Sequence, residues 1–382
     1  FEADRQTLTL YDRRSGKKTT LTGDLDYSIG NFDWAPNSRD IYFCTQDKGR
    51  YSIGKVSVKG GDAKFVVTGA YDNNLRVAAD GKTLVFSRQR VNEPTELYRS
   101  STSGKKITQL TGINADLRAE LEMNPIEEFW FEGAEGRQVH GLITKPPFFE
   151  EGKKYPMILL IHGGPQGAFS DNFHYRWNVQ MFASPGYVVA TVNFTGSTGY
   201  GQDFTDAISG DWGGAPYEDI MKGVDYILEN YDYIDAERIG AAGASYGGYM
   251  INWIEGHTDR FVCLVSHAGV YNLESMYGST EELWFPEWEY EGTPWTNVEM
   301  YEKFSPHRFA AEFKTPCFVI HGEHDYRVPY TQGLEFFTAL QRQGVESKLL
   351  FFPDEYHFVA KPQNAELWWA SLHEWFENHL KQ

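Results

Sequence analysis

The chain has 382 residues, with 35 Lys or Arg against 53 Asp or Glu, so its formal net charge is −18. This length allows two domains, and the negative charge disfavours nucleic acids and anionic membranes as partners. The longest apolar runs have the length of buried strands, not of a membrane span, so we expect no membrane association.

Three cysteines, Cys44, Cys263 and Cys317, are too few for a disulfide framework. The chain begins at Phe1 without an initiator methionine or a signal peptide. We expect this start to be a cut in a longer chain, and export cannot be read from it.

The first third of the chain contains a repeat of 43 residues. Units with several short strands at such a period are typical of β-propeller blades, and about four to eight blades are needed to close a ring. Since only two blades and a fraction are visible, we expect residues 1–118 to be the C-terminal blades of an incomplete propeller. A small independent β-meander is the alternative. The matching positions are Trp34 and Val77, Ile41 and Leu84, Phe43 and Phe86, and Gly69 and Gly112.

From about Ile126 the pattern changes to alternating strands and helices, which places a second domain at residues 119–382. An antiparallel pair is expected first, at 127–132 and 137–145. This alternation predicts an α/β fold with a doubly wound, mostly parallel sheet and helices on both faces. The expected strands are 155–162, 187–193, 238–242, 261–266, 316–322 and 348–352, and the expected helices are 219–230, 246–255, 331–343 and 365–380.

One pentapeptide, Gly243-Ala244-Ser245-Tyr246-Gly247, fits the G-x-S-x-G nucleophile elbow. A serine on a sharp turn from strand to helix projects out of the sheet, where a base and a substrate can both reach it. Such a turn brings strand and helix close together and needs small residues around it, which the flanking glycines supply. Ser245 is therefore the candidate nucleophile.

Partners for this serine are expected after other strands, because working residues lie at the carboxyl ends of parallel strands. His162-Gly163-Gly164-Pro165 offers the Gly164 amide as one oxyanion donor, and the amide of Tyr246 is the second. Asp325 and His357 follow later strands and complete the chain order Ser, Asp, His. The candidate triad is Ser245, Asp325 and His357.

Two other interpretations of the nearby acids and histidines remain. Asp354 lies three residues before His357 and is an alternative partner for it, although Asp325 comes from the preceding strand and is favoured. His321 and His324 flank Glu323, but this spacing fits no zinc motif, so we expect neither a metal nor a cofactor.

Several motifs in order resemble the prolyl oligopeptidase family of serine peptidases, and within it the acylaminoacyl-peptidase and dipeptidyl-peptidase 5 branch. The resemblance covers residues 120–382 and implies an α/β-hydrolase fold preceded by a propeller that restricts entry to short peptides. It also implies that Arg327, two residues after the catalytic aspartate, binds a substrate carbonyl or acyl group; a surface arginine paired with a local carboxylate is the alternative. The motifs are His162-Gly163-Gly164-Pro165, residues 193–201, Gly210-Asp211-Trp212-Gly213-Gly214, residues 245–249 and residues 321–329.

One departure concerns Ala244, because some dipeptidyl peptidases have Trp before the nucleophile. Ala244 fits the acylaminoacyl-peptidase branch better. An aromatic and acidic segment, 269–295, includes Trp284 and Phe285, which we expect to form an apolar wall for the acyl side of the substrate; a surface subdomain packed on itself is the alternative. Glu281 and Glu282 either bind a substrate amino terminus or form a solvated pair.

The candidate triad predicts acyl-enzyme chemistry, and the resemblance implies a serine exopeptidase that releases N-terminal dipeptides from short peptides. The alternatives are an acylaminoacyl peptidase or oligopeptidase, a carboxylesterase on the same fold, and a non-catalytic binding scaffold. The resemblance also suggests a periplasmic or secreted location and allows a homodimer.

Overall fold

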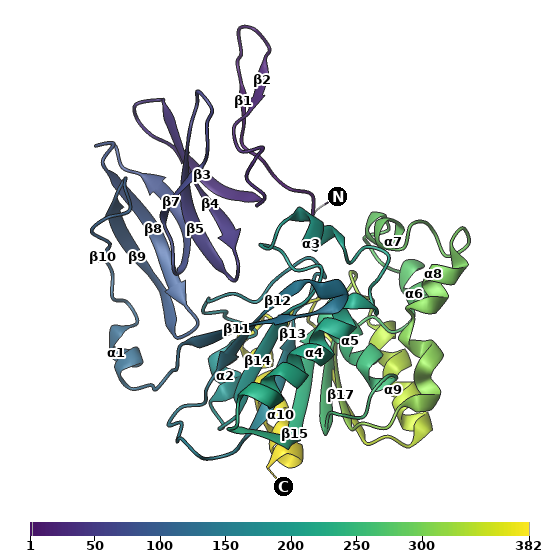
Figure 1. Cartoon of the computed structure of the whole chain (residues 1–382). Helices are drawn as coiled ribbons and strands as arrows, with labels where there is room; N and C mark the ends of the chain where they lie inside the picture. Colours follow the sequence, from purple (N-terminus) through teal and green to yellow (C-terminus); the bar gives the residue numbers. More distant parts are fainter. Residues whose placement is uncertain (2, 382) are drawn as a thin grey trace.

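The computed structural model describes residue 1 and residues 3–381. Figure 1 shows an all-β part built from the first third of the chain, which lies beside a larger part with helices around a sheet. A short hairpin of β1 (Thr9–Tyr11) and β2 (Lys18–Thr20) stands apart from the two large sheets. A five-residue helix, α1 (Ala115–Ala119), follows the last strand of the all-β part.

Apart from the hairpin, the all-β part is one sheet in the order β10-β9-β8-β7-β5-β4-β3, with β6 paired to β5. The 43-residue repeat corresponds to two antiparallel units, β3–β6 and β7–β10, whose second and third strands begin 43 residues apart. A parallel pairing of Tyr51 with Tyr71 joins the units. The strands are β3 (Ile29–Trp34), β4 (Asp40–Asp47), β5 (Arg50–Ser57), β6 (Lys64–Val67), β7 (Tyr71–Val77), β8 (Thr83–Arg90), β9 (Glu93–Ser101) and β10 (Thr108–Gln109).

Packing on both faces explains why the middle of β4 is fully buried. Ile41 and Phe43 belong to one apolar cluster, whereas Tyr42 and Cys44 belong to another on the opposite face. Within the described residues this sheet does not close on itself. The repeat is therefore seen as two four-stranded units, and a propeller stays a prediction.

The second sheet follows the order β11-β12-β14-β13-β15-β16-β17-β18. β11 pairs antiparallel with β12, and β12 with β14, whereas every later pairing is parallel, as the strand and helix alternation predicted. The strands are β11 (Ile126–Glu132), β12 (Gln138–Thr144), β13 (Tyr155–Ile161), β14 (Val188–Asn193), β15 (Ile234–Ala244), β16 (Cys263–His267), β17 (Cys317–Gly322) and β18 (Ser347–Phe352).

Helices cover both faces of this sheet, since alternate residues of β13 belong to two different apolar cores. Met157, Leu159 and Ile161 belong to the core that includes α4, α5 and α9, whereas Ile158 and Leu160 belong to the core with α2 and α10. This is the doubly wound α/β arrangement expected from the sequence. The helices are α2 (Val179–Ala183), α3 (Gln202–Asp206), α4 (Ala215–Asn230), α5 (Tyr246–Glu255), α6 (Leu273–Tyr277), α7 (Trp284–Glu289), α8 (Val298–Lys303), α9 (Thr331–Gln343) and α10 (Pro362–Leu380).

The two parts are joined through the loop that follows β13. Asp171 is buried, donates its amide to the carbonyl of Gly49 at 2.7 Å, and accepts the amide of Val91 at 2.8 Å on its carboxylate. Arg90 forms an ion pair with the same carboxylate at 3.1 Å. The N-terminal sheet therefore fixes a loop that, as described below, forms part of the central cavity.

Candidate active site

Ser245 lies at the turn between β15 and α5, with φ of 59° and ψ of −120°. β15 lies between β13 and β16, so this turn is at the middle of the sheet. A Cβ on Gly243 would come within 2.3 Å of the Gly247 carbonyl oxygen, and one on Gly247 within 2.1 Å of the Ile161 oxygen. Only glycine fits at these two positions, which is the crowding that the elbow motif implies.

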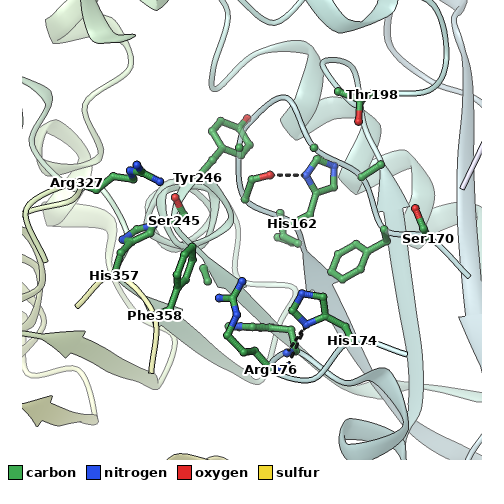
Figure 2. Close-up of a pocket in the computed structure, with 18 of the residues that line it drawn as sticks. His162, Ser170, His174, Arg176, Thr198, Ser245, Tyr246, Arg327, His357 and Phe358 are labelled. Atoms are coloured by element: carbon green, nitrogen blue, oxygen red, sulfur yellow. Dashed lines mark hydrogen bonds between the residues drawn. The ribbon is translucent and has the colours of Figure 1, made fainter. Parts of the chain in front are cut away.

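The loops after β17 and β18 bring an acid and a base to the same edge of the sheet. Asp325 follows β17 and is 1% exposed, and one of its carboxylate oxygens accepts the amides of Arg327 and Val328 at 3.1 and 3.0 Å. The other oxygen lies 2.7 Å from Nδ1 of His357, which follows β18. His357 and Ser245 both line one cavity, and Figure 2 shows them next to each other.

A second histidine, His321 in β17, also contacts this aspartate. Its Nε2 donates to the Val328 carbonyl at 2.8 Å and lies 3.4 Å from the Asp325 oxygen that faces His357. Burial alone would raise the pKa of Asp325, but the hydrogen bonds from His321 and His357 outweigh it and hold that pKa well below its usual value. Asp325 is thus ionised at neutral pH, as an acid that orients an imidazole must be.

The alternative acid, Asp354, lies elsewhere. Its carboxylate binds Lys361 at 2.6 Å and Asn364 at 2.9 Å on the protein surface, and the described contacts of His357 do not include it. The geometry therefore pairs His357 with Asp325, the acid from the neighbouring strand.

The two residues expected to supply the oxyanion donors line the same cavity as Ser245. Gly164 lines the cavity and has a φ of +126°, a conformation that side chains rarely adopt, while Tyr246 is the first residue of α5. Gly163 and Gly164 belong to the loop that follows β13. A Cβ on Gly163 would lie 3.1 Å from the Cβ of Ser245, so this loop passes close to the nucleophile. The Tyr246 side chain points away into the core, where its hydroxyl donates to the Trp212 carbonyl at 2.6 Å.

Buried polar contacts hold this loop in place. Nε2 of His162 lies 2.8 Å from the Ser197 hydroxyl, and burial lowers the pKa of His162 to about 4, so the ring is neutral. The side-chain amide of Asn193 bonds both the amide and the carbonyl of Phe169. The motifs at 162–165 and 193–201 therefore support each other structurally.

The cavity has a volume of about 560 Å³ and lies between the two parts of the chain. Gln46, Tyr51 and Tyr71 line it from the N-terminal sheet, and all its other lining residues come from the α/β part. Gln46 accepts a hydrogen bond from the Thr198 hydroxyl at 2.7 Å across the boundary. A cavity of this size accommodates a short peptide segment.

The expected substrate-binding residues are only partly brought together. Phe285 and Arg327 line the cavity, but Trp284 does not; its side chain is 49% exposed and packs edge-on against Phe1. Arg327 forms an ion pair with Glu282 at 2.7 Å, and Glu282 also lines the cavity. Arg327 is thus both at the site and paired with a local carboxylate, so the two alternatives for it are compatible.

Sequence reasoning missed the cavity residues of the loop after Gly164, among them His174 and Arg176. This loop has no regular apolar period and no motif that marks a site. It also missed Tyr51 and Tyr71, whose strand pattern gives no sign that they face a second domain.

Neither a metal site nor a membrane span is found in the described part of the chain. No three His, Cys, Asp or Glu side chains gather there in a way that would hold a metal ion. No helix among residue 1 and residues 3–381 is both long and apolar enough to cross a bilayer. All three cysteines are buried as free thiols.

A serine on a sharp elbow and an aspartate–histidine pair, at the carboxyl edge of a doubly wound sheet, define an α/β-hydrolase fold. The profile of the prolyl oligopeptidase family matches residues 173–382, which is more than half of the chain. The chain belongs to this family of serine peptidases.

Curated relatives match over the whole chain. A dipeptidyl-peptidase 5 of Schizosaccharomyces pombe is 36% identical over 386 residues, covering 100% of this chain and 56% of the relative. One from Porphyromonas gingivalis is 35% identical over 388 residues, with the same two coverages. The chain therefore spans a little over half the length of these relatives.

Among solved structures, the acylaminoacyl peptidase of Pyrococcus horikoshii superposes with a TM-score of 0.90 at 28% identity. That comparison covers 100% of this chain and 60% of the other. An acylaminoacyl peptidase in complex with Z-Gly-Gly-Phe-chloromethyl ketone gives a TM-score of 0.89, also at 28% identity and with the same coverages. The similarity thus extends over both parts of the chain.

Proposed function

We propose that the protein is a serine exopeptidase that releases dipeptides from the amino termini of short peptides. The observation that carries this proposal is the cavity in which Ser245, on its strained elbow, lies beside a histidine that is hydrogen bonded to a buried, ionised aspartate. The similarity to dipeptidyl-peptidase 5 proteins over the whole chain supports the substrate class.

In this mechanism His357 takes the proton of Ser245 as the hydroxyl attacks the scissile carbonyl. Asp325 keeps the imidazole in the tautomer with a proton on Nδ1 and stabilises the imidazolium that forms. The amides of Gly164 and Tyr246 donate to the oxyanion of the tetrahedral intermediate. His357 then returns the proton to the leaving amine, and water releases the acyl group from Ser245.

An acylaminoacyl peptidase is the second candidate, and two observations favour it. The solved structures with TM-scores near 0.9 bear that name, and Ala244 precedes the nucleophile.

Three cavity residues are proposed to bind the substrate. Glu282 lines the cavity and is a candidate partner for a free amino terminus, although it also binds Arg327. Arg327 and Phe285 are proposed to contact the acyl side of the substrate, and Trp284 stays a prediction for this role.

The N-terminal part is proposed to be the end of a β-propeller, with the boundary near residue 118. The two four-stranded units 43 residues apart support this, as do the cavity residues that this part contributes. A propeller above the cavity would limit substrates to short peptides. A periplasmic or secreted location and a homodimer stay predictions from the family.

Hydrolysis of two chromogenic substrates by the protein and its Ser245→Ala variant tests the proposal. One substrate is a dipeptidyl amide with a free amino terminus, and the other is an N-acetylated aminoacyl amide. Cleavage of the first that needs Ser245 is expected. Preference for the acetylated substrate would indicate an acylaminoacyl peptidase instead. If neither substrate is cleaved in a Ser245-dependent way, a carboxylesterase and a non-catalytic scaffold remain as the candidate functions.

A further inference from the structure

Two polar side chains of the loop after Gly164, His174 and Arg176, line the cavity away from Arg327. In Figure 2 Arg327 and Arg176 lie on different sides of Ser245, with Phe358 between the serine and Arg176. The two arginines differ in their partners. Arg327 is paired with Glu282 at 2.7 Å, whereas no carboxylate of the described chain lies within ion-pair distance of Arg176.

The guanidinium of Arg176 is held in place by stacking, and none of its N–H donors forms a hydrogen bond with a described residue. Its central carbon lies 3.7 Å from the centre of the Phe358 ring, and Tyr175 is the next ring, at 5.5 Å. Stacking on an aromatic face fixes the plane of the guanidinium but occupies none of its N–H donors. The Nε atom is buried and has no hydrogen-bond partner among the described residues.

His174 adds a second donor beside this cation. Its Nδ1 accepts the amides of Arg176 and Trp177 at 3.2 and 3.1 Å, so the proton of the neutral ring is on Nε2. Burial, together with the charge of Arg176, lowers the pKa of His174 to about 4, which keeps the ring neutral above about pH 5. No described residue accepts a hydrogen bond from Nε2–H, and His174 lines the cavity, so this donor is available to a bound group.

An unpaired, partly buried cation is costly unless an anion compensates it when the site is filled. A guanidinium fork matches a carboxylate, because two parallel N–H donors can bind its two oxygens. In a chain with a net charge of −18, this partly buried positive charge within the cavity points to a specific anion rather than to a general attraction for anions.

The position of Arg176 indicates which end of the substrate bears this anion. Arg327, Glu282 and Phe285 are proposed to contact the acyl side. His357 must protonate the leaving amine, so the leaving group departs on the imidazole side of Ser245. Phe358 follows His357 directly, and Arg176 lies over the Phe358 ring.

We propose that Arg176 and His174 form a subsite for a carboxylate of the leaving group. This inference rests on the proposed peptidase function and adds a substrate class to it, namely short peptides whose leaving part is anionic. The carboxylate is either the C-terminus of a tripeptide or the side chain of an acidic residue after the scissile bond. Both present the same group to the arginine.

The test compares three tripeptide substrates with the same first two residues. One ends in alanine with a free carboxylate, one in alanine amide, and one in aspartic acid α-amide. Charge-assisted hydrogen bonds typically change an equilibrium by roughly tenfold to a hundredfold. We expect kcat/KM to be at least about tenfold higher for one carboxylate substrate than for alanine amide.

Variants then assign this preference to the subsite. Arg176→Met should bring the ratio of the two kcat/KM values close to one, whereas Arg342→Met, which removes an exposed arginine on α9, should leave the ratio unchanged. Preference for the free acid identifies the C-terminus as the source, and preference for the aspartyl peptide identifies a side chain. Equal kcat/KM for all three substrates, or a ratio that survives Arg176→Met, would overturn the subsite.

Failure of the peptidase function itself gives a different result, namely no Ser245-dependent cleavage of any tripeptide. Calorimetric binding of the same peptides to the Ser245→Ala protein then decides the subsite separately. It is supported if a carboxylate peptide binds about tenfold more tightly than the amide and Arg176→Met removes the difference. It is refuted if the peptides bind equally or do not bind.

Discussion

Replacing Asp325 by Asn tests how the aspartate acts on His357. One carboxylate oxygen accepts the amides of Arg327 and Val328, so the asparagine oxygen should keep that position. Its NH₂ group would then face Nδ1 of His357, where the carboxylate oxygen now lies 2.7 Å away. Because an NH₂ group can only donate there, the imidazole would be held with its proton on Nε2 and could not accept the proton of Ser245.

The expected loss is large because the fold holds the asparagine in this orientation. In the flipped orientation the NH₂ group would face the amides of Arg327 and Val328, which are also donors, and the side chain is only 1% exposed, so water cannot compensate. In serine-protease triads this change lowers kcat by about 10⁴, which corresponds to about 5 kcal/mol of transition-state stabilisation. We expect a similar fall in kcat, and a smaller change in KM, for a free dipeptidyl chromogenic substrate.

Asp354→Asn is the matched control, since Asp354 pairs with Lys361 at the surface and not with His357. It should leave kcat within about twofold. The reasoning is refuted if Asp325→Asn retains more than about a tenth of the activity while remaining folded by its thermal melt, or if the two variants lose activity equally.

Three further predictions concern the fold. Gly247→Ala should abolish activity and lower the melting temperature, because its Cβ would lie 2.1 Å from the Ile161 oxygen; a variant with normal melting and kcat would contradict this. Glu255 is buried, and burial raises its pKa to about 8, so stability should fall as the pH rises from about 4.5 to 8. Chemical denaturation should show that the free energy of unfolding of Glu255→Gln depends less on pH in this range than that of the unaltered protein. The same pH dependence in both proteins would contradict this prediction. Asp171→Asn should raise KM and cost about 2–4 kcal/mol of stability, because it weakens the buried acceptor of Arg90 and Val91; unaltered kinetics and denaturation would argue against a role for this junction.

The carboxyl group of Glu255 binds its proton more tightly in the folded chain than in the unfolded chain. Between pH 4.5 and 8 the unfolded chain has released this proton while the folded chain keeps it, so raising the pH favours unfolding. One carboxylate oxygen accepts the amides of Lys314 and Thr315, whereas the other is buried with no hydrogen-bond partner among the described residues, which disfavours the ionised form. A glutamine has nearly the same shape and does not titrate.

Local signals made the α/β part predictable from the sequence. Continuous apolar runs marked strands buried on both faces, and α5 and α9 begin and end where their patterns predicted. The glycines around Ser245 indicated the elbow because that backbone leaves no room for a side chain. Strand ends were less certain, and β15 begins at Ile234, four residues before the predicted start, where it pairs with Tyr155.

Contacts between distant segments could not be predicted in the same way. Trp284 and Phe285 are neighbours in sequence, but successive residues of a helix point about 100° apart, so only Phe285 reaches the cavity. The choice between Asp325 and Asp354 depended on how two loops fold back on each other. No motif marks Arg176, because its stacking on Phe358 and its lack of an ion-pair partner among the described residues are visible only in the folded structure.

The 43-residue period identified the repeating unit but not how many units there are or how they are arranged. Alternating apolar residues specify a strand with buried faces, and β4 and β8 correspond at that spacing. Ring closure depends on the number and tilt of blades, which no local pattern encodes.

Labelling with a fluorophosphonate, read by intact mass and by peptide mapping, tests whether Ser245 is the nucleophile. We expect a single adduct on Ser245 that forms in the folded protein. The adduct should be absent in Ser245→Ala and form much more slowly in His357→Ala, because only His357 activates this hydroxyl. The absence of an adduct in folded protein, or a labelling rate that does not depend on His357, would contradict the roles of Ser245 as nucleophile and His357 as its base.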